Sequence, residues 1–101
     1  MDENRQFFRI KNTGRILAKI ENNPIEIVDI SATGVLIKKN NLVPKHGILE
    51  LNIHNFSMNI SYEVLRSEQY TMVLVFNKEE EINRLFLVLK NLRNEQSKQS
   101  E

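Results

Sequence analysis

Residues 49–64 contain the feature that most constrains the fold, a strict alternation of apolar and polar side chains on both sides of a turn near Asn55. Successive side chains of an extended strand point to opposite faces, so a period of two gives the strand one apolar and one polar face. The apolar positions are Leu49, Leu51, Ile53, Met58, Ile60, Tyr62 and Val64. This pattern predicts two β-strands that bury one face.

Earlier segments have the features of shorter strands. Residues 16–20 alternate in the same way, and Asn22–Pro24 is a turn signal. The segments 25–27 and 35–37 are apolar on either side of an interruption at residues 29–34. We therefore expect two strands joined by a turn at that interruption.

The apolar period changes near Phe76. In residues 70–76 both the odd-numbered and the even-numbered positions are apolar, which predicts a strand that is covered on both faces. After it, apolar residues recur at helical spacing, at Ile82, Leu85, Phe86, Leu89 and Leu92. Asn77 is the expected cap of this helix, and Glu79–Glu81 favour the positive end of its dipole. We expect the apolar stripe of the helix to lie on strand 70–76.

About six short strands followed by one helix predict an all-β fold, a closed or nearly closed antiparallel β-barrel whose helix covers one opening. The length of 101 residues suits one domain. We divide it into an arginine-bearing arm at residues 1–13, the barrel with its helix at 14–94, and a polar, frayed tail at 95–101. The arm is expected to be irregular rather than a strand.

Composition excludes several classes of protein. The chain has no cysteine, which removes disulfides, thiolate zinc sites and thiol nucleophiles. The net charge of +1 provides no general field for DNA or RNA, and neither is expected as a partner. No apolar run is long enough for a signal peptide or a membrane span, so we expect a cytoplasmic protein without direct membrane insertion.

Catalytic motifs are also missing. The sequence contains no His-Glu-x-x-His, Gly-x-Ser-x-Gly or glycine-rich phosphate loop. His46 and His54 are expected on the surface, because a metal site needs three or four ligands. We therefore predict no enzymatic activity, no catalytic residue, no metal and no cofactor.

Two short motifs carry candidate binding residues. Arg5 and Arg9 offer planar donors that suit phosphate oxygens and the O6/N7 edge of guanine, although this spacing alone favours a solvated basic arm. Asp29, Ser31 and Gly34 form an Asp-x-Ser-x-x-Gly turn, in which the carboxylate can accept two hydrogen bonds from guanine. Gly34 permits a positive φ or the close approach of a flat base. The alternative is a turn with a purely structural role.

These two motifs, in this order and about twenty residues apart, resemble the double signature of the PilZ domain family, which comprises bacterial receptors for cyclic di-GMP. The resemblance implies a six-stranded antiparallel barrel with a C-terminal helix. It also implies that Arg5 and Arg9 contact phosphates and guanine edges, and that Asp29 and Ser31 hold a guanine beside Gly34. Asn4 occupies the position that this family associates with the number of ligands bound.

The expected function is that of a cyclic di-GMP receptor that signals to a protein partner in motility, adhesion or biofilm formation. Phe7 or Phe8 should pin the arm to the barrel, and ligand binding should redirect its tip. One alternative is a PilZ-like adaptor that binds proteins without nucleotide. Another is a small barrel that binds RNA or single-stranded DNA. The expected oligomeric state is a monomer or a weak dimer.

Overall fold

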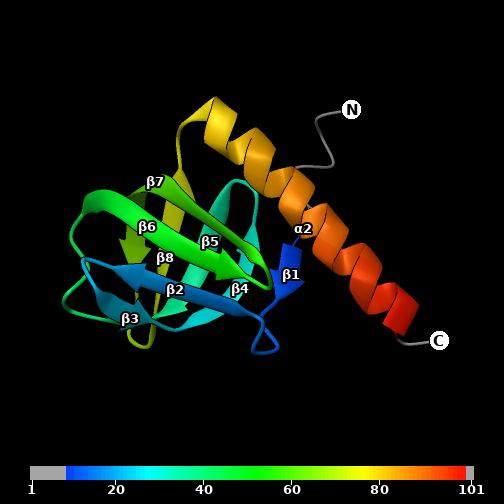
Figure 1. The fold of residues 1–101 in the computed structure, drawn as a ribbon. Helices are drawn as coiled ribbons and strands as arrows, with labels where there is room; N and C mark the ends of the chain where they lie inside the picture. Colours follow the sequence, from blue (N-terminus) through cyan, green and yellow to red (C-terminus); the bar gives the residue numbers. More distant parts are fainter. Residues whose placement is uncertain (1–8, 100–101) are drawn as a thin grey trace.

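The computed structural model describes residues 9–99, and the side chains of residues 9–93. Within the described residues, eight strands precede one long helix (Figure 1). In order they are β1 (Arg9–Lys11), β2 (Ile16–Ile20), β3 (Asn23–Ile25), β4 (Ile27–Ser31), β5 (Gly34–Lys38), β6 (His46–Ile53), β7 (Phe56–Ser67), β8 (Thr71–Phe76) and α2 (Glu79–Gln99).

The strands form one antiparallel sheet in the order β1-β4-β5-β8-β7-β6-β2-β3. The sheet curls into a half-barrel, and α2 lies across one of its open sides (Figure 1). Only Glu26 separates β3 from β4, so this residue connects the last strand of the sheet to the second. The predicted class, an antiparallel all-β fold with one C-terminal helix, is confirmed.

The number of strands differs from the six that we expected. The segment around residues 25–27 breaks at Glu26, because β3 pairs with β2 whereas β4 pairs with β5. The arm contributes β1, so the expectation of an irregular lead-in is wrong for Arg9–Lys11. Ile10 is the one inward residue of β1 and pairs with Ile30, and a single apolar position produces no alternation in the sequence.

Asn12 joins the end of β1 to the start of β2 through both ends of its amide. Its Nδ2 donates to the carbonyl oxygens of Ile16 (2.9 Å) and Ile27 (3.1 Å). Its Oδ1 accepts from the N–H groups of Gly14 (2.9 Å) and Ile16 (3.2 Å). These four bonds satisfy backbone groups between β2 and β4, which are not paired with each other in the sheet.

Apolar side chains from the inner faces of the strands and from α2 form one core. The alternating residues from Leu49 to Tyr62 lie in it as predicted, and Val64 packs against it partly buried. Leu85 and Leu89 of α2 are completely buried there. The helix backbone approaches β7 most closely, and its apolar stripe shares the core with the inner residues of strand 70–76. Glu81 accepts a hydrogen bond from the Ser61 N–H (2.9 Å), and the Arg84 guanidinium lies 6.0 Å from the centre of the Phe56 ring.

Both ends of the helix differ from the expectation. The Ile82 N–H donates to the Lys78 carbonyl (2.9 Å), so Lys78 rather than Asn77 holds the capping position. The helix continues to Gln99, which makes most of the expected frayed tail helical. Within residues 9–99, no helix is long and apolar enough to cross a membrane.

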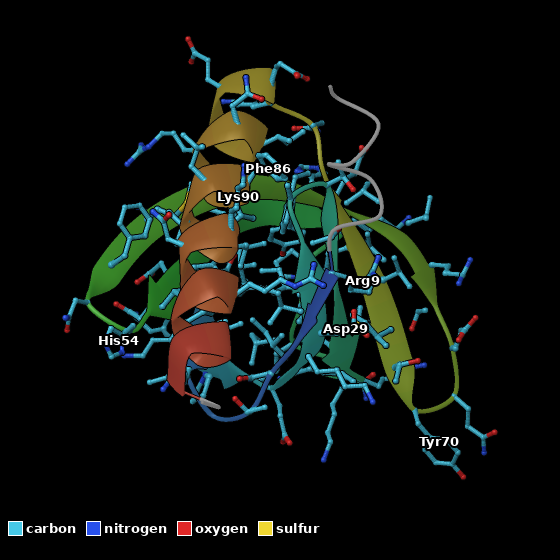
Figure 2. All side chains as sticks on the ribbon, turned by 90° about the vertical axis from the view of Figure 1, so that its right-hand side faces the viewer. Arg9, Asp29, His54, Tyr70, Phe86 and Lys90 are labelled. Atoms are coloured by element: carbon cyan, nitrogen blue, oxygen red, sulfur yellow. The ribbon has the colours of Figure 1, made fainter. Side chains whose placement is uncertain are left out.

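Strand β8 is covered fully on one face only. Met72, Leu74 and Phe76 point into the core, whereas Val73 and Val75 on the outer face are half-buried. Tyr70 precedes the strand and is 75% exposed, at the free end of the β7–β8 hairpin (Figure 2). The expected cover on both faces is therefore wrong, and the outer face of β8 belongs to a groove.

Candidate ligand-binding site

A groove with a volume of about 420 Å³ lies over the outer face of β5 and β8. Leu36, Val73 and Val75 give it an apolar base. Arg9 and Asp29 line it from β1 and β4, and Arg66 lines it from β7. A hollow of this size, with an apolar base and charged side chains at its edges, has room for a small polar molecule.

Arg9 and Asp29 form an ion pair through Nη1 and Oδ1. Their side chains come from the neighbouring strands β1 and β4 (Figure 2). The Arg9 side chain is 50% exposed and that of Asp29 is 17% exposed, so the carboxylate is the more sheltered partner. The pair brings together one residue from each of the two sequence motifs.

A β-bulge turns Asp29 toward the groove. Ile25 and Ile27 are buried, so strict alternation would place Asp29 on the inner face as well. The register of β4 against β5 shifts between Ile27 and Asp29, and Asp29 lies opposite Leu36 on the outer face. Asp29 is therefore a strand residue, and the turn of the motif consists of Ala32 and Thr33 only.

Ser31 lies directly opposite Arg9 in the sheet, but its side chain is completely buried. Its Oγ lies 3.3 Å from the Gly34 carbonyl oxygen, to which it donates. Ser31 Oγ also accepts a hydrogen bond from the Thr33 N–H (3.3 Å). It lies within hydrogen-bonding distance of Thr33 Oγ1 as well (3.3 Å). The structural interpretation of the turn thus accounts for the hydroxyl of Ser31 in the structure.

Gly34 serves the packing of β5 against β8. A Cβ atom at this position would lie 2.8 Å from the Leu74 carbonyl oxygen, well inside normal contact. Among the described glycines, a positive φ occurs at Gly14 (97°) and not at Gly34. Of the two interpretations given for Gly34, a positive φ is therefore not found, and the close approach of β8 is a structural reason for a glycine here.

The structure brings Arg9, Asp29 and Gly34 to the groove and buries Ser31 beside it. Arg5, Asn4, Phe7 and Phe8 lie outside the described residues. Their predicted roles stay predictions.

Sequence reasoning missed the other wall of the groove. Leu65 and Arg66 line it from β7, at a second register shift that alternation does not reveal. One signal for the groove was present in residues 70–76, where both faces of the strand are apolar. Val73 and Val75, on the outer face of that strand, form the base of the groove. His46 and His54 are exposed as predicted, and residues 9–93 contain no cluster of metal-ligating side chains.

A model of the PilZ domain-like family matches residues 9–97, so the chain belongs to the PilZ-like family. This confirms the resemblance seen in the two motifs. The chain is also similar to a Legionella protein of known crystal structure that is described as uncharacterised. The two are 52% identical with a TM-score of 0.86, and the similarity covers 88% of this chain and 97% of the other. No curated protein matches the chain.

Proposed function

We propose that this protein is a non-enzymatic receptor that binds cyclic di-GMP in the groove over β5 and β8 and signals to a protein partner. The observation that carries the proposal is the pairing of Arg9 with Asp29 at the edge of an apolar base. Two motifs about twenty residues apart thereby place a cation and a carboxylate in one place, as the PilZ signature implies.

The chemistry of the groove suits a guanine nucleotide. The Asp29 carboxylate can accept from the N1–H and N2–H₂ groups of guanine, and the Arg9 fork can donate to phosphate oxygens or to O6 and N7. Leu36 and Val73 offer an apolar surface for the face of a base. In this proposal Arg5 supplies a second arginine, and ligand binding redirects the tip of the arm.

The existing ion pair does not oppose such a ligand strongly. Arg9 is half exposed, and ion pairs at that exposure contribute about 0–1 kcal/mol. A phosphate can therefore replace the carboxylate as the partner of Arg9 at small cost, which would release Asp29 for the base.

Isothermal titration of the full chain with cyclic di-GMP tests this proposal. Arg9→Ala and Asp29→Ala should each weaken binding about tenfold or more, because each removes a charge-assisted hydrogen bond. Lys19→Ala and Glu26→Ala are matched controls that change the same charges at exposed positions outside the groove, and they should bind like the wild type. Absence of wild-type binding at micromolar concentrations would refute the receptor function.

Two observations favour a second function, that of an adaptor. Ser31 is buried and Arg9 pairs with Asp29, so these polar side chains already have partners within the protein. An adaptor that binds proteins without nucleotide would retain the motif for structure alone. In that case the wild type would not bind cyclic di-GMP, and Asp29→Ala would alter stability only.

A further inference from the structure

We propose that Arg66 is a ligand-binding residue of this groove and holds a phosphate of the nucleotide on the side opposite Arg9 and Asp29. The inference rests on the proposed function, because it concerns the same ligand. It goes beyond the two motifs, since Arg66 belongs to neither of them and lies on β7, far from both in the sequence.

A β-bulge places Arg66 in the groove. Met58, Ile60 and Tyr62 are buried, so strict alternation along β7 would direct Arg66 to the inner face. The register of β7 against β8 shifts between Val64 and Arg66, and Arg66 becomes the partner of Val73 on the outer face. Bulges of this kind redirect side chains and are frequent beside functional sites.

The bulge in β7 has a counterpart in β4, and together they create one polar–apolar row. Strands β4, β5, β8 and β7 are adjacent in the sheet. Their paired residues are, in order, Asp29, Leu36, Val73 and Arg66. Each bulge turns one charged residue outward, so a carboxylate and a guanidinium stand at the two ends of two apolar side chains.

The length of this row fits a ligand with several polar groups. Three strand spacings separate Asp29 from Arg66, which amounts to roughly 14 Å measured along the curled sheet. A cyclic dinucleotide carries two bases and two phosphates and can therefore contact both sides of the groove at once. A mononucleotide offers its phosphates at one end only.

Glu68 forms an ion pair with Arg66 and would compete with a phosphate for it. Its Oε2 lies 3.0 Å from Arg66 Nε, and the two side chains are 61% (Arg66) and 55% (Glu68) exposed. A guanidinium carries four further N–H donors on its terminal nitrogens. Because an exposed pair of this kind is weak, a phosphate can displace or share the contact. Removal of Glu68 should therefore favour the ligand rather than weaken it.

Titration of the full chain with cyclic di-GMP at low and moderate salt tests the role of Arg66. Arg66→Ala should weaken binding about tenfold or more and reduce its salt dependence, since a phosphate contact is lost. Glu68→Ala should bind as tightly as the wild type or several-fold more tightly. Lys19→Ala, which removes one positive charge outside the groove, should stay within about twofold of the wild type.

The outcomes separate this inference from the proposed function. If Arg9→Ala and Asp29→Ala weaken binding but Arg66→Ala behaves like Lys19→Ala, the inference is wrong and the receptor function stands. If the wild type does not bind, both are overturned. Thermal unfolding of Arg66→Ala and Arg66→Gln tests whether these variants are folded. A loss of affinity in Glu68→Ala equal to that in Arg66→Ala would also contradict the inference.

Discussion

Arg9 lies directly opposite Ser31 in the β1–β4 ladder, yet its guanidinium pairs with the carboxylate of Asp29, two positions earlier on β4. Diagonal pairs of this kind lie within reach of long side chains on one face of a sheet. The contact makes the short strand β1 part of the groove, because it ties the arginine of one motif to the aspartate of the other.

The Arg9–Asp29 pair should matter little for stability. Because Arg9 is half exposed, the coupling free energy between the two residues should not exceed about 1 kcal/mol. A double-mutant cycle with Arg9→Gln and Asp29→Asn, followed by urea unfolding, measures this value. Variants that lose ligand binding should thus remain folded, and a coupling of several kcal/mol would contradict the binding role argued for the pair.

Gly34→Ala should destabilise the fold by about 1–3 kcal/mol, because the new Cβ would collide with the Leu74 carbonyl oxygen. In a domain of this size each kcal/mol lowers the melting temperature by roughly 4–8 °C. Gly47→Ala is the matched control, since its Cβ would meet the Tyr62 ring at 3.3 Å and should cost less. Equal melting temperatures for Gly34→Ala and the wild type would show that the strands separate easily there.

Asn12→Asp should cost about 1–3 kcal/mol in the free energy of unfolding at neutral pH. The substitution replaces the Nδ2 donor by an oxygen that faces the carbonyl groups of Ile16 and Ile27. Asn41→Asp makes the same chemical change at an exposed turn position and should stay within about 0.5 kcal/mol of the wild type. Urea unfolding compares the two, and similar values would mean that the amide bridge is dispensable.

Glu81→Ala should loosen the attachment of α2 to the sheet. Strand β8 ends at Phe76, opposite Tyr62, so the Ser61 N–H beyond it depends on the Glu81 carboxylate. Its loss should cost about 1–3 kcal/mol. Glu80→Ala removes the same charge from the same helical turn at an exposed position and should cost about 0.3–1 kcal/mol. If chemical denaturation gave the same loss of unfolding free energy for Glu81→Ala and Glu80→Ala, the helix dipole alone would explain both.

Tyr62 should make stability fall at alkaline pH. Burial, reinforced by the negative charge of Glu21, raises the pKa of Tyr62 above its usual value. The unfolded chain then loses this proton first, so the contribution is complete below about pH 10 and is lost as the pH rises through the folded-state pKa. The measurable quantity is the free energy of unfolding of the wild type minus that of Tyr62→Phe.

At neutral pH this difference should be about 1 kcal/mol, since the Tyr62 hydroxyl donates to the Pro44 carbonyl (3.0 Å). It should stay constant up to about pH 10 and shrink as the pH rises further. Tyr70→Phe changes a ring that is 75% exposed. The free energy of unfolding of this variant should therefore depend on pH as that of the wild type does. A constant difference between the wild type and Tyr62→Phe would contradict the prediction.

Local patterns predicted much of this fold because each of them reports burial directly. The alternation at residues 16–20 and 49–64 identified β2, β6 and β7, and the spacing from Ile82 to Leu92 identified α2. The two motifs identified Arg9 and Asp29, which the structure brings together. Short strands escaped detection, since β1 and β3 have three residues each and depend on backbone pairing with their neighbours.

The sequence alone determined the antiparallel all-β class, the C-terminal helix and the family, because apolar period and motif spacing are local properties of the chain. Only the tertiary structure decided which side chains face the groove. The two bulges, at Ile27/Asp29 and Val64/Arg66, reverse the parity of the residues that follow them. Each bulge is defined by the register of one strand against its partner, so the outward positions of Asp29 and Arg66 exist only once those strands have paired.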